Sequence, residues 1–347
     1  MQIGHLKVGV EWPPFVIAEM SGNHNQSLAR ALQIVEAAAA AGAQAVKLQT
    51  YTADTMTLAL SEGSFLIDDP QSPWRGSSLH ELYRLAHTPW DWHRAIMERA
   101  RELGLLCFST PFDATAVEFL EELGVPAYKI ASFENVDLHL IRKVAATRKP
   151  MIISTGMAAL AEIDEAVRTA RCAGCRDLVL LKCTSTYPAS PENSNIRTIP
   201  HLRAVFGCEV GLSDHTMGIG VAATAVAHGA TVIEKHLTLD RTSGGVDSSF
   251  SLEPAEFCAL VRELRGAWQS LGAVTFGPTQ AEMPSLAFRR SIHIVKDLRA
   301  GDQLDLENLR CIRPGGGLPP KMLEVLLGRK VNRDVRRGTP TRWDLVS

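Results

Sequence analysis

The sequence lacks the features that mark membrane, secreted and nucleic-acid-binding proteins. No apolar run reaches the ~18 residues of a membrane span, because stretch 35–46 is broken by Glu36, Gly42 and Gln44. The opening residues, MQIGHLKVGVEWPP, do not have the basic, apolar and small-residue regions of a secretory signal. A net charge of -2 excludes the strongly basic balance that nucleic acid favours. We therefore expect a cytoplasmic protein whose partners include neither a membrane nor a nucleic acid.

A disulfide framework and a zinc ribbon are also excluded. The chain has seven cysteines, an odd number, spread over 347 residues, which indicates reduced thiols. Cys172 and Cys175 form a CxxC pair, but no second pair follows at the spacing of a zinc ribbon. The length allows one domain of roughly 250 residues with a small appendix, or two medium domains.

One rhythm repeats from Phe15 to about Leu271: a short apolar run, a polar turn, and then a stretch with helical spacing. The predicted strands are 16–19, 45–49, 106–109, 128–130, 151–155, 178–183, 210–213 and 232–236. The predicted helices are 27–41, 92–103, 115–123, 159–172, 218–228 and 254–271. Eight short strands that alternate with helices favour an α/β fold of the (β/α)8 TIM-barrel type over an open sheet.

The two ends of the chain depart from this rhythm. Residues 3–10 predict a short hairpin that covers the amino-terminal mouth of the barrel. The stretch VTFGPTQAEMPS is rich in turn residues and predicts an extended linker. We therefore divide the chain into a catalytic barrel at 1–274, a linker at 275–287 and a separate small domain at 288–347.

Polar side chains follow every predicted strand. In barrels the carboxyl ends of the strands meet at the mouth where catalysis occurs. A single Ser or Thr at such a place is commonly a cap or a turn residue, but eight such ends converge on one mouth. In chain order the polar residues are Glu19, Asn23, His24, Lys47, Gln49, Ser109, Thr110, Lys129, Ser132, Glu134, Ser154, Thr155, Lys182, Thr184, Tyr187, Ser213, Asp214, His215, Glu234, Lys235 and His236.

The types of these residues indicate an anion site beside a metal site. Four lysines and four hydroxyls suit a small anion that bears phosphate and carboxylate groups. His215 and His236 end adjacent strands, so the two imidazoles are a candidate divalent-metal site, with Asp214 and Glu234 as supporting groups. The loop RTSGGVDSSFSLEP places Asp247 and Ser249 near a substrate, or is a flexible connector. The lysines are 47, 129, 182 and 235, and the hydroxyls are 110, 132, 154 and 213.

The strings at these strand ends closely resemble the sialic-acid synthase family. They are IAEMSGNHN, VKLQT, FSTPFD, YKIASFE, IISTGM, KCTSTYP, GLSDHT and IEKHLTLD, in this order. In the tail, RSIHIVKDLRAGDQL, ENLRCIRPGGGLPP and RGTPTRWDL resemble that family's antifreeze-like (SAF) domain. The resemblance implies an enzyme that joins phosphoenolpyruvate to an open-chain amino sugar.

The resemblance also implies a role for each matching residue. His215 and His236 match ligands of manganese or magnesium, and Glu134 matches a carboxylate near the reacting carbons. Arg313 matches an arginine that reaches the other subunit's barrel, which implies a domain-swapped homodimer. The positions that match phosphoenolpyruvate contacts are Lys47, Thr110, Lys129, Ser132, Ser154 and Ser213. The positions that match sugar contacts are Glu19, Gln49, Tyr187 and Asp247.

Several strings look more like the pseudaminic acid synthases than the N-acetylneuraminate synthases. They are YTADTMTL, WRGSSLHELYRLAHTPWDWH, KIASFE and GGVDSSFSLEP. They imply 2,4-diacetamido-2,4,6-trideoxy-L-altrose as the sugar, and Phe133 would suit its more apolar face. An N-acetylneuraminate or legionaminate synthase is an alternative with the same chemistry. A Schiff-base pyruvate aldolase that uses Lys129 or Lys182, or a sugar-binding barrel without activity, would be a different class of protein.

Overall fold

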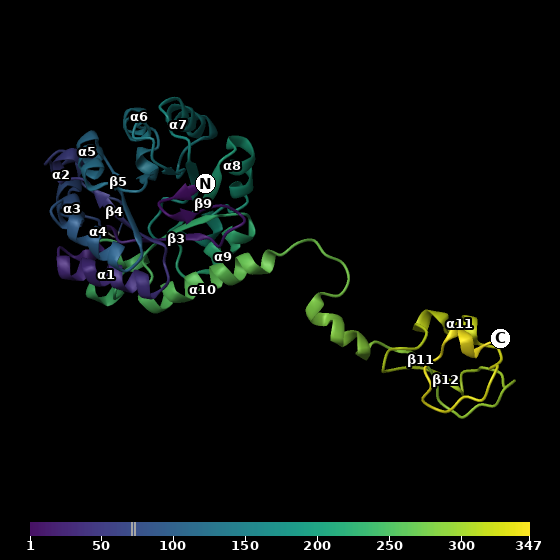
Figure 1. Cartoon of the computed structure of the whole chain (residues 1–347). Coiled ribbons are helices and arrows are strands. Elements are labelled where there is room, and N and C mark those ends of the chain that lie inside the picture. The colour runs from purple at the N-terminus through teal and green to yellow at the C-terminus, as the bar shows by residue number, and fades with distance from the viewer. Residues whose placement is uncertain (71, 73) are drawn as a thin grey trace. The chain divides into compact units, whose positions relative to one another are not determined.

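The computed structural model describes residues 1–70, 72 and 74–347, and within them eight parallel strands close a barrel (Figure 1). The strands follow one another around the barrel in chain order, and β10 pairs with β3 to close it. This confirms the (β/α)8 barrel that the alternation of strands and helices predicts. The bounds are β3 Phe15–Glu19, β4 Ala45–Thr50, β5 Leu106–Pro111, β6 Tyr128–Ile130, β7 Met151–Ser154, β8 Leu178–Cys183, β9 Glu209–Asp214 and β10 Val232–His236.

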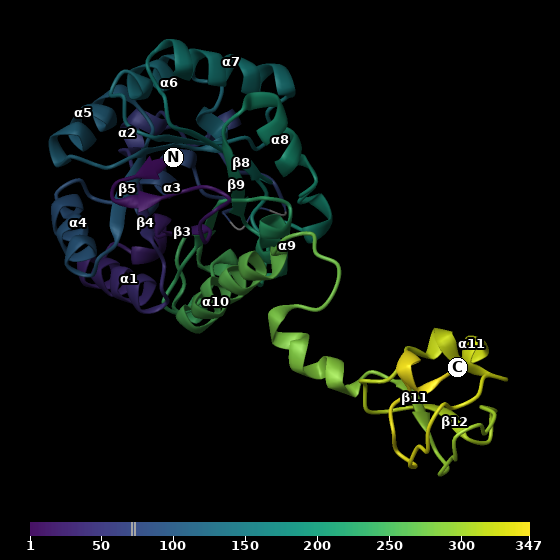
Figure 2. The ribbon, with the colours of Figure 1, turned by 45° about the vertical axis from the view of Figure 1, so that its right-hand side comes forward.

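Helices surround the strands, as Figure 2 shows for α1 and α4 to α8. Local sequence sets their ends: the Asp113 side chain accepts hydrogen bonds from the backbone N–H groups of Thr115 and Ala116 and starts α5, and Gly124 ends it. The bounds are α1 Leu28–Ala40, α2 Ala53–Met56, α3 Leu79–Ala86, α4 Trp92–Glu102, α5 Ala114–Leu123, α6 Leu138–Ala145, α7 Leu160–Cys172, α8 Thr198–Phe206, α9 Gly220–Ala227 and α10 Pro254–Leu271.

The hairpin expected near the start of the chain is formed by β1 Gln2–Ile3 and β2 Leu6–Lys7, which pair antiparallel. Gly4 turns between them with φ +56°, and a Cβ there would lie 2.7 Å from Cδ2 of Leu106, the first residue of β5. Ile3 is fully buried in the main hydrophobic core. The hairpin therefore packs against the amino-terminal end of the barrel, opposite the ends where the polar side chains collect.

The chain divides into two compact units, Met1–Gly272 and Ala273–Ser347. The second unit contains the antiparallel pair β11 Ser291–Ile294 and β12 Leu309–Ile312, the short helix α11 Leu323–Leu326 and a hydrophobic core of its own. The stretch predicted to be extended is instead partly 3-10 helix, over Gln280–Phe288. Its start is organised by Glu282, whose carboxylate accepts hydrogen bonds from the backbone N–H and hydroxyl of Thr279.

None of the helices in the described part of the chain combines the length and the apolar character that crossing a membrane requires.

Candidate active site

The registers of the strands decide which polar side chains enter the barrel. Paired residues of neighbouring strands share a face, and successive residues along a strand alternate between faces. Lys47 on β4 and Lys129 on β6 both approach Glu234 on β10, across the barrel, so these three side chains face the interior. Followed around the barrel, the registers place nine polar residues on this interior face near the carboxyl ends. They are Glu19, Lys47, Gln49, Thr110, Lys129, Ser154, Ser213, Glu234 and His236.

Two lysines and two glutamates form the charged centre of this face. Lys47 Nζ lies 2.5 Å from Glu19 Oε2 and 3.7 Å from Glu234 Oε1, and Lys129 Nζ lies 3.5 Å from Glu234 Oε1. All four side chains are almost completely buried. Burial alone would lower the pKa of Lys47, but the carboxylates of Glu19 and Glu234 offset this effect and raise it. Lys47 therefore stays an ammonium ion inside the barrel.

A second layer of donors surrounds the lysines. Lys47 Nζ donates to Thr110 Oγ1 at 3.1 Å, and Ser213 Oγ donates to Glu234 Oε1 at 3.3 Å. The Ser154 hydroxyl is buried and has no hydrogen-bond partner among the described residues. A Cβ at Gly156 would lie 2.7 Å from Ser132 Oγ, so only glycine fits beside this hydroxyl. Ammonium and hydroxyl donors that point into one space are suited to a phosphate or a carboxylate.

The two histidines predicted as metal ligands lie together at the same mouth. The ring centroids of His215 and His236 are 5.3 Å apart. His215 Nδ1 lies 3.0 Å from the carbonyl oxygen of Thr184 and donates to it, so Nε2 is the nitrogen available to a metal ion. Burial lowers the pKa of His215, but the hydrogen bond to Cys183 and the Cys183 charge outweigh this effect and raise it, so metal binding at Nε2 would displace a proton. Burial, and then the charges of His215 and Lys47, hold the pKa of His236 well below its usual range. A neutral His236 has the protonation state that a metal ligand needs.

The groups next to His236 include a carboxylate. Nδ1 of His236 is buried without a hydrogen-bond partner in the described part of the chain, and Asp247 Oδ2 lies 3.9 Å from it. Asp247 itself accepts a hydrogen bond from Ser21 Oγ. Among residues 1–70, 72 and 74–347, no group of three or more His, Cys, Asp and Glu side chains is arranged to hold an ion. The protein would therefore supply two imidazoles, and the rest of a metal's coordination shell would be water and substrate oxygens.

Aromatic rings form one wall of the mouth. The Tyr187 ring lies 4.5 Å from the His215 ring and 5.2 Å from the ring of Phe250, centroid to centroid. Trp74, from the long connection between β4 and α4, lies 6.0 Å from Tyr187, and its Nε1 donates to the carbonyl oxygen of Val246 at 2.9 Å. Trp74 and Phe250 lie in the strings WRGSSLHELYRLAHTPWDWH and GGVDSSFSLEP, but no role was predicted for either residue, because neither is close to the end of a predicted strand. The wall is an apolar surface beside polar groups.

Two further carboxylates lie among the polar groups at the strand ends. Glu19 Oε1 accepts a hydrogen bond from Gln49 Nε2 at 3.2 Å. Glu134 lies in the turn Ser132–Glu134 that follows β6, and its Oε2 has no hydrogen-bond partner among the described residues. Burial raises the pKa of Glu134 to about 7, although the nearby Lys129 ammonium opposes this effect. Glu134 can therefore take up or release a proton near neutral pH.

Three residues expected at the mouth face the opposite side of the barrel wall. Lys235 Nζ lies 2.6 Å from Asp214 Oδ2 and 2.6 Å from the carbonyl oxygen of Thr216. Lys182 Nζ donates to the carbonyl oxygen of Cys183. The prediction that Lys182 and Lys235 join the cation cluster is therefore wrong, because strand alternation turns the residue next to an inward side chain outward. Asp214 is likewise bound to Lys235 and does not approach the interior.

Two further strand-end residues are held away from the mouth. Ser109 Oγ is hydrogen-bonded to Thr50 Oγ1 at 2.6 Å on the outer face. His24 Nδ1 accepts from the backbone N–H of Gln26, and its Nε2 lies 3.2 Å from Thr88 Oγ1. Burial lowers the pKa of His24 to about 4, so it is a neutral, structural histidine.

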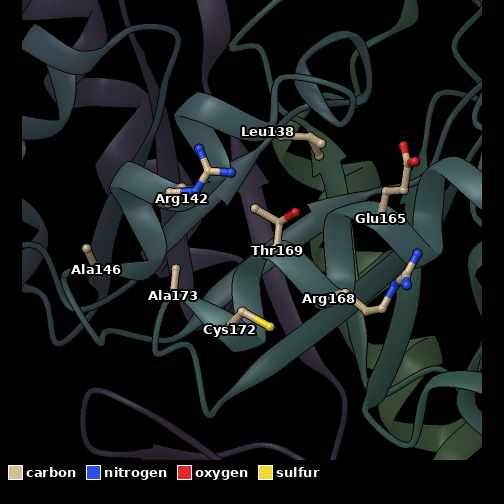
Figure 3. Close-up of a pocket in the computed structure, with 8 residues that line it drawn as sticks. All are labelled: Leu138, Arg142, Ala146, Glu165, Arg168, Thr169, Cys172 and Ala173. Carbon is tan, nitrogen blue, oxygen red and sulfur yellow. The ribbon is translucent and has the colours of Figure 1, made fainter.

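Arg313 belongs to the second compact unit, and the barrel unit has a surface groove of its own. Arg313 follows β12 in the second unit, and its side chain is exposed. A groove of about 620 Å³ lies between α6 and α7 and is lined by Leu138, Arg142, Ala146, Glu165, Arg168, Thr169, Cys172 and Ala173 (Figure 3). None of these lining residues belongs to the interior face of the barrel, so the groove is separate from the candidate site.

The chain matches known protein families over both of its compact units. Residues 34–275 match the model of the NeuB family, and residues 289–347 match the SAF domain. The chain therefore belongs to the NeuB family and carries a SAF domain after its barrel.

Individual relatives with a named activity are similar to the chain over most of its length. The chain is 42% identical to a pseudaminic acid synthase of Campylobacter jejuni over 338 residues, which cover 97% of each protein. It is 37% identical to an N,N'-diacetyllegionaminic acid synthase of Legionella pneumophila, over 96% of this chain and 94% of the relative. Among solved structures, the N-acetylneuraminic acid synthetase of Leptospira borgpetersenii in complex with citrate superposes with a TM-score of 0.74. That protein is 32% identical, and the match covers 82% of this chain and 94% of the other.

Proposed function

We propose that this protein condenses phosphoenolpyruvate with 2,4-diacetamido-2,4,6-trideoxy-L-altrose to give pseudaminic acid and phosphate. Three pseudaminic acid synthases, from two Campylobacter jejuni strains and Helicobacter pylori, are 40% to 42% identical to the chain over nearly its whole length. One observation carries the proposal: the buried donors Lys47 and Lys129 share one barrel mouth with the pair His215 and His236. This arrangement brings an anion and a carbonyl compound together.

Phosphoenolpyruvate would lie among the buried donors. Its phosphate and carboxylate groups would accept hydrogen bonds from Lys47 and Lys129 and from the hydroxyls of the surrounding layer. The hydroxyls assigned to this role are those of Thr110, Ser132, Ser154 and Ser213. Because Ser154 Oγ has no hydrogen-bond partner in the described residues, it is free to donate to such an anion. These contacts would hold the third carbon of phosphoenolpyruvate toward the sugar.

A divalent cation, manganese or magnesium, would be held by His215 and His236. The donors fit such an ion, since both imidazoles have a nitrogen available to it and the pKa of His236 keeps that ring neutral. When bound, the ion would polarise the aldehyde oxygen of the open-chain sugar. Sugar hydroxyl and acetamido groups would contact Glu19, Gln49, Tyr187 and Asp247.

The third carbon of phosphoenolpyruvate would attack the aldehyde carbon, which forms the new carbon–carbon bond, turns the aldehyde oxygen into a hydroxyl and leaves positive charge on the second carbon. Water would then add to this second carbon, and phosphate would leave with cleavage of the carbon–oxygen bond. Glu134 would orient this water and accept its proton, because the carboxylate is close to the lysine that holds the substrate and has a pKa near 7. The ammonium groups of Lys47 and Lys129 would stabilise the departing phosphate.

The proposal extends to assembly and location. Arg313, exposed in the SAF domain, would enter the barrel mouth of a second copy of the chain, so that the active form is a domain-swapped homodimer. We place the enzyme in the cytoplasm.

The sugar is what separates the proposal from its nearest alternative. The legionaminate synthase that is 37% identical to the chain favours a second candidate with the same chemistry and a different diacetamido sugar. Incubation with phosphoenolpyruvate, Mn²⁺ and a panel of diacetamido and N-acetyl hexoses, read by mass spectrometry and phosphate release, tests both. We expect the nine-carbon product to form fastest from the L-altrose derivative. Faster turnover of another sugar would reassign the substrate, and a borohydride-trapped lysine adduct with pyruvate would indicate an aldolase instead.

A further inference from the structure

Lys235 and Asp214, which face away from the mouth, form an ion pair directly behind the two histidines. Asp214 precedes His215 at the end of β9, Lys235 precedes His236 at the end of β10, and the two charged residues are register partners. Their side chains are 1% and 0% exposed. Since neighbours on a strand face opposite sides, each histidine enters the mouth from a backbone whose other face is held by this pair.

The pair also fixes the backbone on both sides of His215. Asp214 Oδ1 accepts hydrogen bonds from the backbone N–H of Thr216 at 2.9 Å and from its hydroxyl at 2.7 Å. Lys235 Nζ donates to the carbonyl oxygen of Thr216 and contacts Asp214 Oδ2, each at 2.6 Å. Asp214, Thr216 and Lys235 thus form one closed network that ties the end of β9 to the end of β10.

Fold stability does not by itself account for a charged network at this place. Removing two charges from water opposes folding, and well-packed apolar residues of similar volume often stabilise a buried position as well or better. Hydrogen-bonded ion pairs instead have a fixed geometry, and groups behind metal ligands commonly set the orientation of those ligands. The network is at the one pair of strand ends where two imidazoles must converge.

We propose that Asp214 and Lys235, linked through Thr216, are positioning residues that set the spacing of His215 and His236 for a divalent cation. The inference rests on the proposed metal site and goes beyond it, because neither residue contacts the cation. Loss of the network would leave both imidazoles present but free to move apart, which weakens cation binding while the lysine and hydroxyl donors for phosphoenolpyruvate stay in place.

The test measures Mn²⁺ binding to the metal-free full-length chain, by electron paramagnetic resonance of free Mn²⁺, in the unaltered protein and in Asp214→Asn/Lys235→Met. This double variant removes both charges together, so no unpaired buried charge remains. We expect Mn²⁺ affinity to fall roughly 10- to 100-fold, the effect typical of groups behind a metal ligand. Urea unfolding of each metal-free protein reports stability separately.

A matched control lies at the other end of the same two strands. Glu209, which begins β9, accepts hydrogen bonds from Arg203 Nη2 at 3.0 Å and from the hydroxyl of Thr231, next to β10, at 2.9 Å. Glu209→Gln/Arg203→Met removes this network and should leave Mn²⁺ affinity unchanged. If Asp214→Asn/Lys235→Met does not fold, Thr216→Val, which removes only the hydroxyl from the network, takes its place with an expected loss of several-fold.

The outcomes separate the two proposals. Mn²⁺ affinity that is equal in the folded network variant and the unaltered protein would overturn the positioning role and leave the metal site intact. Equal losses in the network variant and the Glu209 control would also overturn it, since the effect would then be one of general stability. An unaltered protein that binds no Mn²⁺ would overturn the metal assignment itself, and the positioning role with it.

Discussion

Strand residues of this barrel face either the interior or the outer side, and two lysines on different strands show the contrast. Lys129 Nζ lies inside the barrel, 3.5 Å from Glu234, whereas Lys182 Nζ donates to the backbone carbonyl of Cys183 on the outer face. Both residues follow short apolar runs, and both have a pKa that burial lowers. The two side chains differ in direction, and therefore in burial and in partners, so substituting each one removes the same charge at two different places.

Lys129→Met should raise the KM for phosphoenolpyruvate and lower kcat/KM by roughly 100-fold, because one buried donor to the anion is lost. Lys182→Met removes the same charge and volume outside the barrel and should change kcat/KM by less than about threefold. Steady-state kinetics with varied phosphoenolpyruvate measures both. Similar losses in the two variants would contradict the interior assignment.

Glu134 links activity to pH. If its carboxylate accepts the proton of the attacking water, kcat should fall as pH drops below about 7, the pKa to which burial raises this group. Glu134→Gln should abolish most turnover and remove this limb of the pH profile. A profile measured between pH 5.5 and 8.5 that keeps the same acidic limb in the variant would exclude Glu134 as its source.

The raised pKa of Glu134 also predicts how the free energy of unfolding changes with pH. A carboxyl whose folded pKa is raised stabilises the fold at acidic pH, and this contribution is lost as pH rises through about 7. Glu134→Gln cannot ionise, so above pH 7 the variant should be more stable than the unaltered protein by on the order of 2 kcal/mol. Urea unfolding at pH 6 and pH 8.5 measures the difference, and a gain that is larger at pH 6 would contradict the account.

Sequence could predict which residues lie near the mouth, but it could not predict all of their directions. The eight apolar runs and the residues at their ends follow from alternation and turn chemistry, and Lys47, Lys129 and His236 indeed face inward. Side chains alternate between the two faces of a strand, so a prediction that is wrong by one residue puts a side chain on the wrong face. For Asp214 and Lys235, the pairing of β9 with β10 is what identifies the face. Register depends on contacts between distant segments, which local sequence does not contain.

At the scale of elements, the barrel strands and the long helices were predictable, and several short helices were not. The strands 128–130, 178–183 and 232–236 and the helix 254–271 have the bounds that periodicity predicts. Helices α2, α3, α6 and α8, with four to nine residues each, were missed, because so few turns give little periodicity. The connection that contains α2 and α3 is also the one that brings Trp74 to the site.

Trp74 gives this connection a measurable role. Trp74→Phe keeps an aromatic ring beside Tyr187 but loses the hydrogen bond from Nε1 to the Val246 carbonyl, next to Asp247. A net loss of about 1 kcal/mol predicts a KM for the sugar that is about fivefold higher, with little change in the KM for phosphoenolpyruvate.

Trp268 offers the control for this variant. Its Nε1 donates to the carbonyl oxygen of Val10 at 3.0 Å, beyond the hairpin at the amino-terminal end of the barrel. Trp268→Phe removes an equivalent bond and should leave both KM values unchanged. Equal changes in the KM for the sugar in the two variants would show that Trp74 has no specific role at the mouth.

At the scale of the whole molecule, the chain consists of a barrel unit and a second compact unit that contains the SAF domain, and the second unit carries one of the proposed site residues. The barrel unit and the SAF unit each have a hydrophobic core, and Arg313 belongs to the SAF unit, away from every other proposed site residue in sequence. If Arg313 acts on a neighbouring barrel, a defective barrel and a defective arginine should complement each other when they are on different chains.

Arg313→Ala and His236→Ala should each be nearly inactive alone. When the two variants are co-expressed, mixed dimers would contain one mouth with an intact barrel and an intact arginine, so activity should return to about a quarter of the normal value per chain for random pairing in a dimer. Phosphate release by the purified mixture measures this recovery. A mixture as inactive as its components would contradict an arginine that acts across subunits.

The reaction itself is tested most directly by following the bridging oxygen of phosphoenolpyruvate. In the proposed reaction, water attacks the second carbon and phosphate leaves with cleavage of the carbon–oxygen bond, at the mouth formed by Lys47, Lys129, His215 and His236. With phosphoenolpyruvate labelled by ¹⁸O at the bridging position, mass spectrometry should find the label in inorganic phosphate and none in the nine-carbon product. Label retained in the sugar product would contradict the proposed chemistry.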